Sequence, residues 1–351
     1  MILQPKPAPH IRSAVSNQSV MGDVILTLMA LYVMAAFYYG PRALALGLCG
    51  VLTCWAADFV CVTLRRMRFN PRDLSPAVTG MIIPLLMPAT VGFSVVAAAG
   101  LFAICFVKHP FGGLGYNIFN PAAGGVAFAM VCWPTAMFSY PGHFIDLAPF
   151  TPVTTALSTG DAYTLYLGGV PTTDFNNILL GLMPGPMGAA NVLVILACMV
   201  YLVARGTVRL QQTAFCLGTV ALLAFFFPRA DVPGLLSVFY ELFCTSVVFC
   251  AVFMLTDPVT SPKRGMAKAL YGLAAGVVIM LFRWHGGYEE TAPFALLLIN
   301  GTSHLFDRLM ELWAARERRL MHDGRPGTEI RPSGQDGGES DDAAAEAEAK
   351  G

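Results

Sequence analysis

The sequence predicts an all-α integral membrane protein with about ten transmembrane helices. Hydrophobic residues make up 56% of the 351 residues and charged residues only 13%, with a mean hydropathy of +0.61. A soluble domain of average composition carries about 25% charged residues. Apolar windows long enough to cross about 30 Å of hydrocarbon also recur along the chain. The formal net charge is zero, so no basic balance indicates a nucleic-acid partner.

The apolar windows form two groups of five around a long polar segment. They are 22–40, 42–64, 75–90, 91–107 and 118–138, then 187–204, 210–228, 235–255, 266–283 and 292–314. The short third and fourth windows, with Pro84 and Pro88, are candidates for broken or re-entrant segments. An odd number of spans in each half gives the halves opposite orientations, which predicts two inverted five-helix repeats.

Lys and Arg predict the orientation, because they concentrate in cytoplasmic segments. With the N-terminus in the cytoplasm, nineteen of the 22 Lys and Arg lie on the cytoplasmic side, and only Arg42, Arg229 and Arg283 lie outside. No cleavable signal peptide is expected before the first window. The predicted parts are a cytoplasmic N-terminus (1–21), a first helical half (22–138), an exterior loop (139–186), a second helical half (187–314) and a disordered cytoplasmic tail (315–351).

All nine cysteines fall within predicted spans, and none forms a Cys-x-x-Cys pair. Metal or iron–sulfur ligation needs clustered thiolates. The cysteines are therefore interpreted as small apolar residues of the helices, and no metal site is expected.

Two polar islands interrupt the apolar pattern. The first, "HPFGGLGYNIFNPAAGG" at 109–125, contains Asn117 and Asn120, and the second, "LTDPVTSPKRG" at 255–265, contains Asp257. Asn120 before Pro121 is typical of a helix N-cap, and Asp257 before Pro258 is typical of a turn. These structural roles do not account for Asn117 or for the glycines of the first island.

The islands, taken in order with a Thr-x-Leu motif between them and "FRWHGGYEETAPFALLLIN" at 282–300 after them, carry a family resemblance. The chain resembles the D subunit of Rnf-type ion-translocating electron transport complexes, and the B subunit of sodium-pumping NADH:quinone reductase is similar. The resemblance extends from about residue 20 to residue 312.

This resemblance implies a flavin-carrying subunit with no complete active site of its own. Members of the family carry FMN linked covalently through its phosphate to a threonine, and a noncovalent riboflavin, for which Asn117, Asn120 and Asp257 are the candidate ligands here. The implied location is the bacterial inner membrane with both termini in the cytoplasm. The implied partners are a flavin transferase, a flavin-bearing G-type subunit, iron–sulfur B- and C-type subunits and A/E-type membrane subunits.

The candidate for covalent attachment is Thr155 in "TPVTTAL" at 151–157. The family pattern has Ser-Gly-Ala before the acceptor threonine and a small residue and Leu after it. Ala156 and Leu157 match the second part, whereas Pro152, Val153 and Thr154 depart from the first. Thr154 is therefore the rival acceptor, and a loop whose threonines only form turns is the structural alternative.

Carboxylates within predicted spans are expensive in lipid and mark a partner, a cavity or an ion path. Asp58 and Glu241 are the candidates for coupling to Na⁺ or H⁺ movement, while Asp307 beside Arg308 fits an interfacial position. Hydrogen bonding between helices is the structural alternative for both candidates. Two other functions stay open: a B-type subunit of the quinone reductase, and a channel or carrier without redox chemistry.

Overall fold

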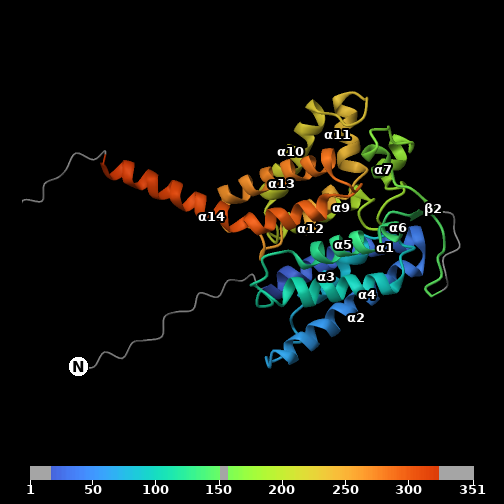
Figure 1. Cartoon of the computed structure of the whole chain (residues 1–351), viewed down its shortest axis with the longest axis horizontal. Coiled ribbons are helices and arrows are strands. Elements are labelled where there is room, and N and C mark those ends of the chain that lie inside the picture. Colours follow the sequence, from blue (N-terminus) through green and yellow to red (C-terminus); the bar gives the residue numbers. More distant parts are fainter. Residues whose placement is uncertain (1–16, 151–156, 324–351) are drawn as a thin grey trace, which may run out of the picture. The chain divides into compact units, whose positions relative to one another are not determined.

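The computed structural model describes residues 17–150 and 157–323, and these residues are mainly helical (Figure 1). The first predicted half and the second half as far as Met310 belong to one compact unit, and Glu311 begins a second unit. The helices of the first half are α1 (Asn17–Tyr39), α2 (Pro41–Leu64), α3 (Ser75–Leu85), α4 (Phe93–Phe102) with the π-helix η1 (Ala103–Lys108), and α5 (Pro121–Cys132). Those of the second half are α9 (Val192–Ala204), α10 (Leu210–Phe226), α11 (Gly234–Phe243), α12 (Val247–Phe253), α13 (Gly265–His285) and α14 (Ala292–Asp323).

Every predicted window therefore contains a helix or a helix pair. Among the described residues, three helices (α1, α2 and α13) are long and apolar enough to cross a membrane. A fourth span results if α11 and α12, which bend by 57° at their junction, are counted together. The apolar helices α3, α4 with η1, α5, α9 and α10 are shorter, at 10–17 residues. The count of ten spans stays a prediction.

The predicted exterior loop has secondary structure of its own. It contains α7 (Asp161–Tyr166), α8 (Phe175–Leu180) and two short strands, and α6 (Pro134–Met137) precedes it. The strands β1 (Tyr140–Pro141) and β2 (Leu157–Ser158) pair antiparallel, with Tyr140 opposite Ser158. At the other boundary, α14 continues to Asp323, beyond residue 314 where the sequence places the end of the last span.

Helices in each half pack closely where glycines face a neighbour. In the first half, α2 packs on α3 and α4, and α1 packs on α2 and α3. A Cβ atom on Gly80 of α3 would lie 2.5 Å from the Gly50 carbonyl oxygen of α2, and a Cβ on Gly50 would collide with the Gly80 carbonyl. Small residues at such contacts let backbones approach, which is how helices associate without a hydrophobic driving force.

The second half repeats this use of glycine. There α10 packs on α11, α12 and α13, and α9 packs on α12. A Cβ on Gly276 of α13 would lie 2.7 Å from the Cys216 carbonyl oxygen of α10. Contact between α1 and α9 joins the halves, and Figure 1 shows the helices of each half gathered beside one another.

Replacing Gly50 by Val should destabilise the protein strongly, because the new side chain meets backbone rather than a movable side chain. Overpacking of this kind costs about 1–3 kcal/mol or more. The measurement is the melting temperature of the detergent-solubilised protein. Gly218→Ala on α10, where nothing lies within 4 Å, is the control and should melt as the wild type. Equal melting of the two variants would contradict the packing argument.

Candidate functional site

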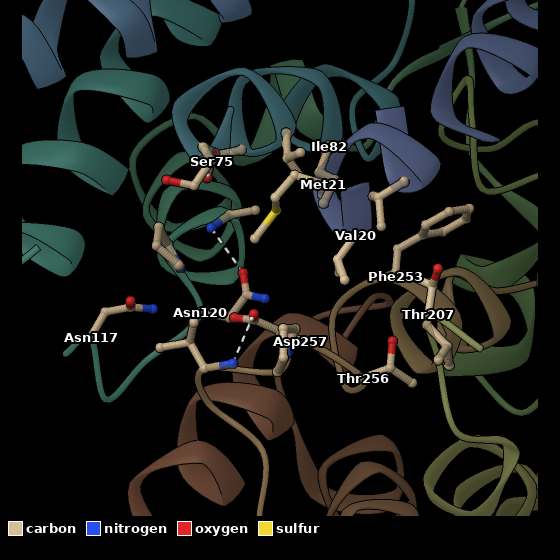
Figure 2. Close-up of a pocket in the computed structure, with 18 of the residues that line it drawn as sticks. Val20, Met21, Ser75, Ile82, Asn117, Asn120, Thr207, Phe253, Thr256 and Asp257 are labelled. Atoms are coloured by element: carbon tan, nitrogen blue, oxygen red, sulfur yellow. Dashed lines mark hydrogen bonds between the residues drawn. The ribbon is translucent and has the colours of Figure 1, made fainter. Parts of the chain in front are cut away.

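The two polar islands meet in one pocket, although about 140 residues separate them in the sequence (Figure 2). The pocket lies where the starts of α1, α3 and α5 meet the ends of η1, α9 and α12. Its empty volume is about 770 Å³, a value that includes open solvent at the mouth. Val20, Met21, Ile82 and Phe253 give it apolar walls.

Asn117, Asn120 and Asp257, the three residues that the sequence selects, all line this pocket. Asn120 also caps α5, as the sequence indicates: its side-chain oxygen accepts hydrogen bonds from the N–H groups of Ala122 (3.0 Å) and Ala123 (3.2 Å). Its side-chain nitrogen donates to the carbonyl of Met254 at 3.3 Å. Most of the amide's hydrogen-bonding capacity is therefore used within the protein.

A buried hydrogen-bond network that includes Asn120 joins the two halves of the molecule. The backbone N–H of Asn120 donates to the side-chain oxygen of Asn300 at 3.0 Å, and the Asn300 amide donates to the Tyr271 hydroxyl at 2.6 Å. Asn300 and Tyr271 are completely buried. Buried polar networks of this kind hold one arrangement when every member is satisfied. The network thus fixes the start of α5 against α13 and α14.

Asp257 and Asn117 keep more of their capacity than Asn120. The carboxylate of Asp257 accepts hydrogen bonds from the Val259 N–H (3.2 Å) and the Thr260 hydroxyl (3.3 Å). Burial raises the pKa of this carboxyl to about 6, although the hydrogen bonds from Val259 and Thr260 lower it. The Asn117 amide donates to the Phe119 carbonyl at 3.2 Å. Both side chains can therefore offer acceptors to a bound molecule.

Further polar residues of the pocket are not selected by the sequence. They are Ser75, Thr79, Lys108, Thr207 and Thr256. Thr256 adjoins Asp257 in the second island, and Lys108 adjoins the first, so proximity to an island is an available signal for these two. Ser75, Thr79 and Thr207 come from other helix ends, and only the packing of the halves brings them here.

Asp58, a candidate for an ion path, is held in a buried ion-pair cluster beside the pocket. Its Oδ1 lies 2.9 Å from both Lys108 Nζ and His109 Nε2. Lys108 also contacts Asp73 (3.3 Å) and the Ser75 hydroxyl (2.8 Å). The cluster links the end of η1 to α2 and to the start of α3. Bonding between helices of this kind is the structural alternative to an ion path for Asp58.

Glu241, the second ion-path candidate, is paired in the same way in the second half. Its carboxylate lies 2.6 Å from Arg229 Nε and also pairs with Arg283. Asp307 is partnered too, since its carboxylate accepts the backbone N–H groups of Lys263 and Arg264 at 3.1–3.2 Å. Each of these carboxylates thus has a structural role.

Comparison with known proteins matches residues 4–313 to the family model described as the NQR2, RnfD, RnfE family. The chain belongs to this family. The match covers both predicted halves and the loop between them, and therefore every element that lines the pocket.

Several curated relatives in the NQR2, RnfD, RnfE family are similar over most of their length. The D subunit of a Na⁺-translocating ferredoxin:NAD⁺ oxidoreductase complex from Acetobacterium woodii is 29% identical, over 86% of this chain and 91% of that protein. The D subunit of a proton-translocating ferredoxin:NAD⁺ oxidoreductase complex from Clostridium ljungdahlii is 28% identical, over 87% and 93%. The D subunit of an ion-translocating oxidoreductase complex from Halorhodospira halophila is also 28% identical, over 85% and 91%. Because the first two names differ in the ion at nearly equal identity, similarity does not select the ion.

Thr154 and Thr155 lie outside the described residues, but both flanks of their segment are placed. Before it, the Phe150 ring stacks on Phe93 at the start of α4, with centroids 5.8 Å apart. The guanidinium of Arg42 donates to the carbonyl of Pro149 at 3.3 Å. After it, Leu157 pairs with Pro141 in the small sheet. The Phe150 flank lies at the start of α4, whereas the pocket lies at the end of η1.

Replacing Lys108 by Met should destabilise the folded protein by about 3–5 kcal/mol, because Asp58 then loses a cation in a buried site. Removing both charges, as Asp58→Asn with Lys108→Met, should recover much of the loss. The measurement is again the melting temperature in detergent.

The matched control for Lys108→Met is Arg205→Met. Arg205 pairs with Asp23 at 3.3 Å, but its side chain is 56% exposed, and exposed pairs contribute only about 0–1 kcal/mol. A double variant no more stable than Lys108→Met alone would show that the charge on Asp58 is not the cause of the loss.

Proposed function

We propose that this chain is the flavin-carrying membrane subunit of an Rnf-type, ion-translocating ferredoxin:NAD⁺ oxidoreductase complex. The observation that carries the proposal is the meeting of both polar islands, one from each half, in one pocket with apolar walls. Family membership and the names of the relatives support it. The B-type subunit of a sodium-pumping quinone reductase is the alternative within the same family.

The pocket fits a noncovalent riboflavin in its chemistry. A flavin ring has an apolar benzenoid edge and a polar pyrimidine edge, and the pocket has apolar walls beside Asn117 and Asp257. When bound, a flavin accepts and releases one or two electrons. In our proposal Asn117 and Asp257 meet the polar edge, while Asn120 holds the start of α5 in place.

The covalent FMN is proposed at Thr155, with Thr154 as the rival. The placed flanks support this segment, because Arg42 and the stacking of Phe150 on Phe93 fix its entry and the β1–β2 pairing fixes its exit. Between Phe93 and Lys108, α4 and η1 comprise 16 residues, or about 24 Å at 1.5 Å per residue. The entry flank of the Thr155 segment and the pocket therefore lie at opposite ends of α4 with η1.

We also propose ten spans in two inverted halves, with both termini in the cytoplasm and the complex in the bacterial inner membrane. The packing supports the repeat: the second helix of each half, α2 or α10, packs on the third and fourth elements of its half. The three arginines that this orientation places outside the cytoplasm are also consistent with it. Arg42, Arg283 and the Arg229 side chain are 5%, 2% and 7% exposed, so these cations serve packing within the protein.

The proposed function requires partner chains. In our proposal they are iron–sulfur B- and C-type, flavin-bearing G-type and A/E-type membrane subunits. Attachment of FMN requires a flavin transferase.

Replacing Thr155 by Val should abolish the ultraviolet fluorescence of the denatured band in a gel, because a phosphodiester needs the hydroxyl oxygen. Valine has nearly the same volume, so membrane insertion should be unchanged. Thr155→Ser keeps the oxygen and should retain some flavin. The chain should be expressed with its flavin transferase, and mass spectrometry should find the FMN mass on the peptide with Thr154 and Thr155.

Thr154→Val is the matched control and should stay fluorescent. If Thr154→Val alone is dark, the acceptor is Thr154. If both single variants stay fluorescent, covalent attachment is not in this segment, and a colourless wild-type chain would favour the channel or carrier.

Replacing Asn117 by Leu should lower the riboflavin extracted per folded protein at least severalfold, because an acceptor for the polar edge is lost. Covalent fluorescence should be unchanged. Asn191→Leu is the control, since Asn191 is also a buried amide, but caps α9 and bonds to Tyr38 away from the pocket. Equal loss of riboflavin in the two variants would assign the effect to folding rather than to the pocket.

A further inference from the structure

A second cluster of buried charges lies between the ends of α10, α11, α13 and the start of α12, away from the pocket. It contains the Glu241 pairs described above, and Glu289 and Glu290 from the connection between α13 and α14. Arg283, Glu289 and Glu290 are 2%, 3% and 1% exposed. Neither the covalent nor the noncovalent flavin site uses these residues.

Glu290 is fully provided with hydrogen-bond donors. Its Oε1 accepts the backbone N–H of Ser246 at 3.0 Å, and its Oε2 accepts the Ser246 hydroxyl at 2.5 Å. Burial raises the pKa of Glu290, while Arg283, Ser246 and Arg229 oppose that shift. Ser246 lies in the break between α11 and α12, so Glu290 accepts hydrogen bonds at the start of a broken helix.

Glu289 has a different environment, although it is the next residue. Its Oε1 accepts one hydrogen bond, from the Tyr140 hydroxyl at 2.9 Å. Its Oε2 is buried and has no partner among the described residues. An ionised carboxylate in this position would leave one charged oxygen without a donor, whereas a protonated carboxyl is a neutral group.

Burial and the neighbouring charge both favour the protonated form of Glu289. Burial raises its pKa to about 8, the negative charge of Glu290 adds to the shift, and the Tyr140 hydrogen bond opposes it. The two guanidinium groups of the cluster are engaged with Glu241. The Tyr140 hydroxyl and the thiols of Cys244 and Cys250 are also electrostatically coupled to Glu290.

We propose that Glu289 is a proton-binding site, in which the buried oxygen that has no partner among the described residues holds the proton. The site joins two parts of the molecule, because Tyr140 belongs to β1 of the loop after the first half, and Glu289 precedes α14 of the second. Gain or loss of the proton changes the charge at this junction by one unit. The site does not depend on any flavin assignment, so its test is separate from that of Thr155.

The test is infrared spectroscopy of the full-length protein in detergent or lipid. A carboxyl stretching band that shifts in deuterated water should be present at pH 7 and should disappear with a midpoint near pH 8. Glu289→Gln should remove the band. Asp174→Asn, which alters an exposed carboxylate in the loop that contains Tyr140, should leave it unchanged.

Two further variants distinguish a proton site from a merely structural residue, because they should move the midpoint in opposite directions. Tyr140→Phe removes the opposing hydrogen bond and should raise the midpoint, whereas Glu290→Gln removes the neighbouring negative charge and should lower it. These shifts keep the test decisive if Glu289→Gln does not fold. A wild-type midpoint near the ordinary value for glutamate, about 4.3, or a band that survives in folded Glu289→Gln, would overturn the proposal.

Discussion

A buried charge or polar group needs a partner inside the protein, and this constraint organises the whole helical bundle. Asp58 is neutralised by Lys108 and His109, and Glu241 by Arg229 and Arg283. Each cluster lies where a helix ends or breaks, at η1 in the first half and near the α11–α12 junction in the second. The π-helix η1 and the break between α11 and α12 are therefore stabilised by charged side chains that would be unfavourable in contact with lipid.

The pocket is a consequence of this arrangement. Lys108 fixes the end of η1 against α2 and α3, so the glycine-rich first island begins from a defined point. Asn120 then fixes the other end of that island through its bonds to Ala122, Ala123 and Met254. With both ends held, Asn117 lies between them on the pocket wall. The residues that hold the pocket are thus distinct from those with acceptors left for a ligand.

The sequence predicts the pocket better than it predicts the charge clusters, for a physical reason. Asn117, Asn120 and Asp257 are recognisable because polar, glycine-rich or proline-containing stretches interrupt apolar runs locally. Ion pairing is not local: Asp58 and Lys108 are 50 residues apart, and Glu241 and Arg283 are 42 apart. The charge pattern accordingly assigns Arg229 and Arg283 to the exterior, whereas the fold buries them as partners of Glu241.

The same pairing restricts how an ion could use Asp58 or Glu241. A carboxylate that already faces Lys108 or two arginines offers little attraction to Na⁺, because the approaching ion meets the positive charge as well. An ion could bind there only after the existing partner moved, and breaking a buried pair costs about 3–5 kcal/mol. Glu289 is under no such restriction: it faces one neutral donor, a tyrosine hydroxyl, and has an oxygen without a partner in the described part of the chain. A proton can occupy this oxygen without displacing anything, so Glu289 can exchange a proton without breaking an ion pair, whereas Asp58 and Glu241 cannot bind an ion without doing so.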